Sequence, residues 1–92
     1  ASRDVPLADL AAEALDPLLA FDAAHDAELV PTLEKYLAVN GSVAKVAQAL
    51  GLHRNTVRYR LTQIADLSGY DPAVTADRVH LYLALNVRRL TA

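Results

Sequence analysis

Two helix-length stretches joined at a single glycine constrain the fold of this sequence most. The segment that begins at Ser42 is SVAKVAQALGLHRNTVRYRLTQIADLSG. Ser42 is a favourable helix N-cap, and Gly51 interrupts the helical pattern with a residue that accepts a positive φ. Two helices joined by a short turn that contains glycine form a helix-turn-helix. We therefore predict helices over 43–50 and from His53 or Arg54 to about 68, with the helix-turn-helix between Ser42 and Ser68.

The second of these helices has one apolar face and one polar face. At about 100° per residue, Leu61, Ile64 and Ser68 fall within about 40° of Val57, so we predict that this face is buried. Arg60 stands where an apolar residue is usual, and Leu61 takes that position's packing role. Small or apolar residues also occur where the motif must pack, at Val46, Ala47, Leu50 and Leu52. The opposite face is predicted to be exposed, and it carries Asn55, Arg58, Tyr59, Thr62 and Asp66.

Helical patterns also account for the rest of the chain. Alanine and leucine dominate and no period-two alternation occurs, so we predict an all-α fold of about five helices in one domain spanning residues 1–92. A first helix is expected over 7–15. Asp16 and Pro17 then indicate the cap and first turn of a short second helix that contains Leu18, Leu19 and Phe21.

Two further helices are predicted on either side of the helix-turn-helix. The one before it is expected to be capped by Asp26 and to end near Val39, with Asn40-Gly41 as its stop. Pro31 removes a backbone hydrogen bond, so this helix either bends at Pro31 or begins there. The last helix is expected to be capped by Thr75 and to run over 76–90.

Charge is distributed unevenly along the chain. Residues 1–34 carry a charge of −7, residues 35–65 carry +5 with no acid, and residues 66–92 carry 0, for a net charge of −2. A basic block without acids indicates a confined surface for a polyanion such as nucleic acid. Chance segregation of charge in a small domain is the alternative.

Composition excludes several other classes of protein. Cysteine is absent, which removes disulfides, zinc fingers and thiol catalysis. The three histidines have no metal-ligand spacing, and there is no Ser-His-Asp order and no phosphate-binding glycine loop, so we expect neither an enzyme nor a cofactor. No membrane-spanning run or signal peptide is seen, which favours a cytoplasmic setting. The chain starts with Ala1 rather than Met, which suggests a piece of a longer protein.

The start of the second helix of the motif carries the predicted DNA contacts. This end of such a helix enters the major groove, where arginine can bond guanine and asparagine can bond adenine. Backbone contacts are expected from the start of the preceding helix and from the first-turn amides. The predicted DNA-binding set is Ser42, Lys45, His53, Arg54, Asn55, Thr56, Arg58, Tyr59 and Thr62.

Alternatives stay open for several of these side chains. Arg54, Arg58 and Lys45 could be solvated helix charges, and Tyr59 could pack under a neighbouring helix. His53 fits a helix start better than a ligand or a catalyst. Arg60, outside the predicted set, could form an ion pair with one of the chain's acids or contact DNA.

The last helix is apolar on two sides, which suggests a second role. Val79, Leu83, Val87 and Leu90 form one apolar face, Leu81 and Leu85 form another, and Tyr82 lies between them. One face serves the domain's own core, and the other could meet the N-terminal helix or a second copy. We favour a homodimer, because paired helix-turn-helix units read two half-sites. The rival interpretation is a protein-interaction module that does not read bases.

The string His53–Leu61, HRNTVRYRL, is far more specific than a generic helix-turn-helix. It is preceded by LVPTLEKYLAVNGSVAKVAQAL and followed by IADLSGYDP and LYLALNV. Over residues 18–90 the chain resembles the C-terminal domain of PucR/CdaR-type bacterial regulators, transcription factors of purine catabolism and sugar-diacid use. The turn and second helix are also similar to those of Fis and NtrC. The resemblance implies a domain that binds double-stranded DNA and is joined at its N-terminus to sensor domains.

Overall fold

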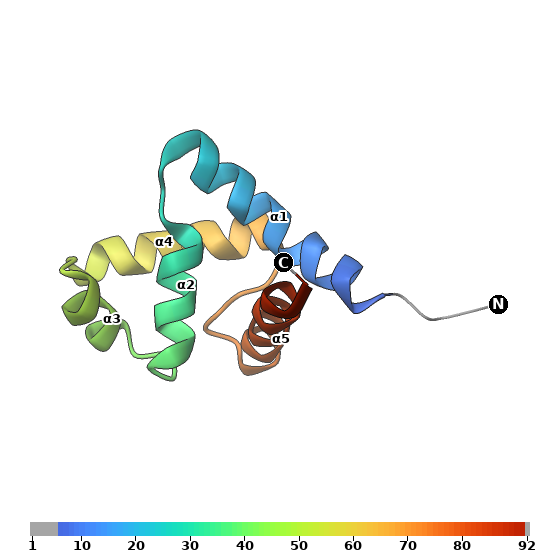
Figure 1. Ribbon diagram of the computed structural model, residues 1–92. Coiled ribbons are helices and arrows are strands. Elements are labelled where there is room, and N and C mark those ends of the chain that lie inside the picture. Colours follow the sequence, from blue (N-terminus) through green and yellow to red (C-terminus); the bar gives the residue numbers. More distant parts are fainter. Residues whose placement is uncertain (1–5, 92) are drawn as a thin grey trace.

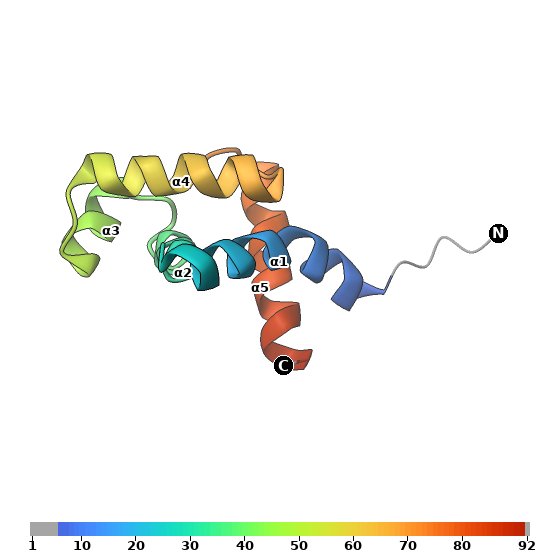
Figure 2. The ribbon, with the colours of Figure 1, turned by 90° about the horizontal axis from the view of Figure 1, so that it is seen from above.

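The computed structural model describes residues 6–91, and this part of the chain forms five helices without strands. The all-α prediction is therefore confirmed. Figures 1 and 2 show that α1, α2 and α5 lie on one side of α4, and that α5 runs away from it. None of the helices in this range is both long and apolar enough to cross a membrane. The helices are α1 (Leu7–His25), α2 (Leu29–Ala38), α3 (Val43–Leu50), α4 (Arg54–Ser68) and α5 (Thr75–Thr91).

Buried residues fall into two clusters that meet at α4. The scaffold core joins α1, α2, α5 and the C-terminal half of α4, and Leu18, Leu33, Ile64 and Leu81 have no exposed area within it. The helix-turn-helix cluster joins α2, α3 and the N-terminal half of α4, and it consists of Tyr36, Val46, Ala47 and Val57. Leu61 packs against both clusters. The full scaffold core is Ala11, Ala14, Leu15, Leu18, Leu29, Val30, Leu33, Ile64, Leu81, Ala84 and Leu85.

The first helix is continuous, which corrects the prediction of two helices divided at Asp16-Pro17. Pro17 lies inside α1, where it removes a backbone hydrogen bond at a typical cost of about 3 kcal/mol. Ala14, Leu15 and Leu18 lie on both sides of Pro17 in the sequence, and all three are buried in the scaffold core. Packing on both sides of the proline therefore outweighs the local break signal.

A carboxylate from α1 caps α2, which corrects the prediction that Asp26 would do so. The Asp22 side chain accepts hydrogen bonds from the Leu29 amide at 2.7 Å and from the Val30 amide at 2.9 Å. Asp26 instead ends α1, in the left-handed conformation at φ 51°. Pro31 is the third residue of α2, so it neither begins the helix nor interrupts it. The first turn of a helix has no intrahelical partner for its amides, and a proline there removes no bond.

The ends of α3 and α4 match the sequence prediction. The Ser42 Oγ accepts the Lys45 amide, and Gly51 ends α3 at φ 67°. Gly69 ends α4 at φ 81°. The turn before α3 contains Asn40 and Gly41, both at positive φ as predicted. The last helix begins at Thr75 itself, one residue earlier than predicted.

The two apolar faces of α5 have different environments. Leu81, Ala84 and Leu85 are buried in the scaffold core, so this face packs within the domain. On the other face, Val79 is 52% exposed and Leu83 is 57% exposed. Leu90 follows them on the same face and is 85% exposed. Val87, the fourth residue of this face, is half-buried against the scaffold core, so the second face is uncovered at Val79, Leu83 and Leu90 in a single copy of the chain.

Candidate nucleic-acid interface

The polar side of α4 is exposed, as the helical angles predict. Val57 and Ile64 have no exposed area, and Leu61 and Ser68 are half-buried. Tyr59 is 64% exposed, so it does not pack under a neighbouring helix. In Figure 2 the helices lie on one side of α4 and leave its other side uncovered. Asp66 is also exposed on this side, near the end of α4, and we define the reading face as the five exposed residues before it, Arg54, Asn55, Arg58, Tyr59 and Thr62.

His53 caps the N-terminus of α4. Its Nδ1 accepts a hydrogen bond from the Asn55 amide at 3.0 Å. Because this nitrogen must offer a lone pair, the ring proton of the neutral histidine lies on Nε2. The prediction that His53 belongs to the helix start is confirmed. The exposed ring keeps its Nε2–H free to donate to an acceptor outside the helix.

Asn55 and Arg58 interact on the reading face. The Arg58 guanidinium donates a long hydrogen bond of 3.4 Å to Oδ1 of Asn55. Asparagine needs both its Oδ1 and its Nδ2 to bond adenine, and arginine needs its fork to bond guanine. The weak bond between the two side chains therefore orients them together but has to open before both can bond bases.

The other polar residues of the predicted set differ in which hydrogen-bonding groups remain free for a contact with DNA. Ser42 is half-buried and uses Oγ as a cap acceptor, whereas Lys45 is exposed. The Thr62 hydroxyl donates to the Arg58 carbonyl at 3.1 Å, which leaves it as an acceptor. Phosphate oxygens are acceptors as well, so Thr62 suits a donor group on a base better than a phosphate. Thr56 is half-buried in the first turn of α4.

Arg60 points away from the reading face. Its guanidinium donates to Oγ1 of Thr32 at 3.1 Å, and the Thr32 hydroxyl donates to the Glu28 carbonyl at 2.7 Å. The partner of Arg60 inside the domain is therefore a buried threonine rather than an acid, and the alternative of a DNA contact stays a prediction. The link ties the middle of α4 to the start of α2. Thr32 is 28 residues from Arg60, so nothing local in the sequence indicates it.

The histidines outside the interface have ordinary packing roles. His25 lies against Phe21 with ring centroids 4.4 Å apart, and His80 stacks on Tyr70 at 4.0 Å. Across residues 6–91, no group of three or more histidine or acidic side chains is placed to hold a metal ion.

Helices α3 and α4 pack around Ala47 and are joined by the turn at Gly51. With the N-terminal half of α4 exposed, this arrangement defines a helix-turn-helix domain that binds DNA. The model of the PucR C-terminal helix-turn-helix domain matches residues 29–87, and the chain belongs to this family of transcriptional regulators. The family resemblance and the expectation that the chain is not an enzyme are thereby confirmed.

Three similar proteins illustrate the relationship. Over 62 residues, or 67% of this chain, it is 42% identical to an uncharacterized protein of Mycobacterium tuberculosis. It is 28% identical over 83% of its length to the DNA-binding transcriptional activator AdeR of Bacillus subtilis. It is also 39% identical over 61% of its length to the carbohydrate diacid regulator of Escherichia coli. The chain spans only 15%, 18% and 14% of these three proteins, respectively.

Proposed function

We propose that the domain binds DNA sequence-specifically, with the N-terminal half of α4 in the major groove. The observation that carries this proposal is the composition of the reading face, where Arg54, Asn55 and Arg58 are exposed together at the start of α4. These side chains are suited to bond guanine and adenine edges. Tyr59 and Thr62 extend the same face by one turn and complete the surface presented to the bases.

Backbone contacts would surround these base contacts. Ser42 and Lys45 lie at the start of α3, which in this motif crosses the DNA backbone. His53 and Thr56 lie at the start of α4, where Nε2–H and the free first-turn amides suit phosphate oxygens. Three of the five positive charges in the acid-free block at 35–65, those of Lys45, Arg54 and Arg58, lie among these contacts, which favours a polyanion at this surface.

Selection of DNA fragments from a random pool, followed by titration at several salt concentrations, tests the proposal. We expect one enriched motif, and an affinity that falls steeply with salt because phosphate neutralisation releases counterions. A pool that yields no motif, combined with binding that is insensitive to salt, would reject sequence-specific recognition and favour the protein-interaction module.

We further propose that the domain pairs with a second copy through the uncovered face of α5. Val79, Leu83 and Leu90 are exposed along it, and a paired helix-turn-helix would read two half-sites about 34 Å apart, one turn of DNA. Sedimentation equilibrium of the wild-type chain, Leu83→Glu and Tyr59→Ser tests this pairing. Tyr59 is the control, because its side chain is about as exposed as that of Leu83 but lies on α4. Self-association lost only in Leu83→Glu supports it, whereas a wild-type chain that stays monomeric at all concentrations contradicts it.

The domain would act as the output part of a longer regulator. The chain covers 15%, 18% and 14% of the three relatives described above, and its family is named for a C-terminal domain. We propose that the preceding part of such a regulator senses a ligand, and that the protein acts in the cytoplasm, where bacterial DNA lies. A full-length regulator whose affinity for the selected motif never responds to any ligand or metabolite extract would argue against this role.

A further inference from the structure

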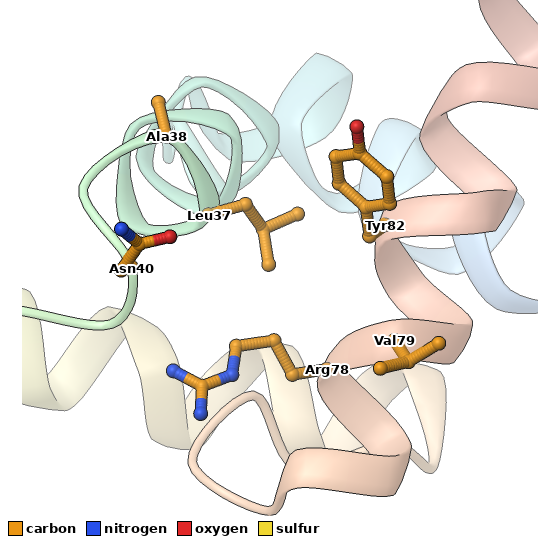
Figure 3. Close-up of a pocket in the computed structure, with 6 residues that line it drawn as sticks. All are labelled: Leu37, Ala38, Asn40, Arg78, Val79 and Tyr82. Atoms are coloured by element: carbon orange, nitrogen blue, oxygen red, sulfur yellow. The ribbon is translucent and has the colours of Figure 1, made fainter.

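Arg78, on the first turn of α5, reaches across a pocket to the turn that precedes α3. Figure 3 shows its side chain extending from α5 along one edge of this pocket, on the side where Asn40 lies, with Leu37 and Tyr82 lining the rest of the pocket. A Cβ added to Gly41 would collide with the Arg78 guanidinium, so the two are in close contact. The Tyr36 hydroxyl borders the same space. The guanidinium is thus held one residue away from Ser42, the N-cap of α3.

The acids closest to Arg78 in the sequence are engaged elsewhere. The Asp77 carboxylate accepts the Asp71 amide at 3.0 Å, and the Asp71 carboxylate accepts the Ala73 amide at 2.9 Å. Within residues 6–91 the Arg78 side chain donates no hydrogen bond, and no buried side-chain nitrogen in this range lacks a partner. The residue is half-buried, and its guanidinium lies against Gly41 and stays accessible to a ligand.

This position extends the predicted backbone contacts beyond the helix-turn-helix. Ser42 and Lys45 start the helix that crosses the DNA backbone in this motif, and α5 places Arg78 against Gly41, the residue before Ser42. A guanidinium presents a fork of donors that matches a phosphate. On the basis of the proposed function, we infer that Arg78 of α5 bonds a phosphate of the DNA backbone next to the start of α3.

Salt-dependent titration of matched variants tests this inference. We would measure the affinity of the wild-type chain, Arg78→Gln, Arg78→Lys and Arg89→Gln for the selected DNA by fluorescence anisotropy. Arg89 is an exposed arginine of the same helix, so its variant controls for the loss of one charge. We expect Arg78→Gln to weaken binding roughly tenfold and to reduce the slope of log K against log salt by about 1, and Arg78→Lys to retain most of that slope.

Two outcomes would overturn the inference. One is an Arg78→Gln slope equal to that of the wild type; an affinity loss that then follows a fall in the free energy of unfolding would make Arg78 a structural support for the Gly41 turn. The other is an equal reduction of the slope in Arg89→Gln. A wild-type chain without specific, salt-dependent binding would instead contradict the proposed function itself.

A phosphate scan locates the contact. Uncharged methylphosphonates would replace single phosphates along the selected DNA. At one position we expect the replacement to weaken DNA binding by the wild-type chain and by Arg89→Gln. The same replacement should have little further effect on binding by Arg78→Gln, because this variant already lacks the partner of that phosphate. If every position weakens all variants by the same factor, Arg78 contacts no phosphate.

Discussion

The scaffold core and the helix-turn-helix cluster differ in size but share one helix. Eleven buried residues from four helices form the scaffold core, whereas four form the helix-turn-helix cluster. Ile64 of α4 belongs to the first and Val57 to the second. The N-terminal half of α4, which carries the reading face, is therefore held by the smaller cluster. The C-terminal half is anchored in the larger one.

This division indicates that the two halves of α4 have different roles: the C-terminal half contributes to the stability of the domain, and the N-terminal half carries the residues for DNA recognition. A change in the scaffold core should alter the free energy of unfolding and leave the contacts to DNA in place. A change on the reading face should do the reverse. Each variant below tests how complete this separation is.

The largest effect is expected from Leu33→Ala in the scaffold core. Leu33 has no exposed area, and truncating a buried leucine costs about 2–5 kcal/mol of folding free energy through lost burial and a cavity. Urea denaturation followed by circular dichroism measures the loss. Leu7→Ala, at the start of α1 where the side chain is 68% exposed, should change stability by less than about 0.5 kcal/mol. Equal losses in the two variants would show that the assigned core is wrong.

Arg58→Ala should produce the opposite pattern. We expect a loss of about 1–3 kcal/mol in affinity for the selected DNA, because a base contact disappears. The free energy of unfolding should stay within about 0.5 kcal/mol, since the side chain is exposed and its bond to Asn55 is long. Anisotropy titration and urea denaturation of the same sample give both values. Unchanged affinity would remove Arg58 from the reading face.

Asp22→Ala tests the connection between α1 and α2. The variant leaves the Leu29 and Val30 amides without their acceptor, and we expect a loss of about 1–2 kcal/mol in unfolding free energy. Glu13→Ala, an exposed acid of the same helix, is the control for the lost charge. If both variants lose the same stability, net charge rather than capping is responsible.

Ser42→Ala should have the smallest effect of the four variants, and it should lower both the stability of the domain and its affinity for DNA. Loss of the cap on α3 is expected to cost about 1 kcal/mol of stability. Affinity for DNA should also fall at a temperature where the variant is fully folded, because Ser42 is a proposed backbone contact. Gln48→Ala, on the exposed side of α3, provides the comparison. Lost stability with wild-type affinity would restrict Ser42 to capping.

The sequence predicts the helix-turn-helix well because its signals are local. Ser42, Gly51 and Gly69 each lie within a few residues of the helix end that they determine. The exposed and buried sides of α4 likewise follow from helical geometry alone.

The misinterpreted features depend on distant partners. Pro17 is a correct local break signal, but the scaffold core overrides it. Asp22 caps amides seven and eight residues later, and Arg60 finds Thr32 on another helix. Arg78 lies outside the basic block and comes next to it only through the fold. Such pairings need the tertiary arrangement and leave no spacing pattern in the sequence.

The proline near the start of α2 has a consequence for the unfolded chain. Pro31 occupies a first-turn position, Asp22 satisfies the two amides before it, and the Thr32 amide bonds the Glu28 carbonyl. The folded state therefore loses no hydrogen bond to the ring. In the denatured ensemble the ring still fixes φ, so fewer conformations have to be given up when the helix forms, which favours folding by about 0.4–1 kcal/mol. The residue that looks like a flaw in the helix contributes by restricting the disordered chain.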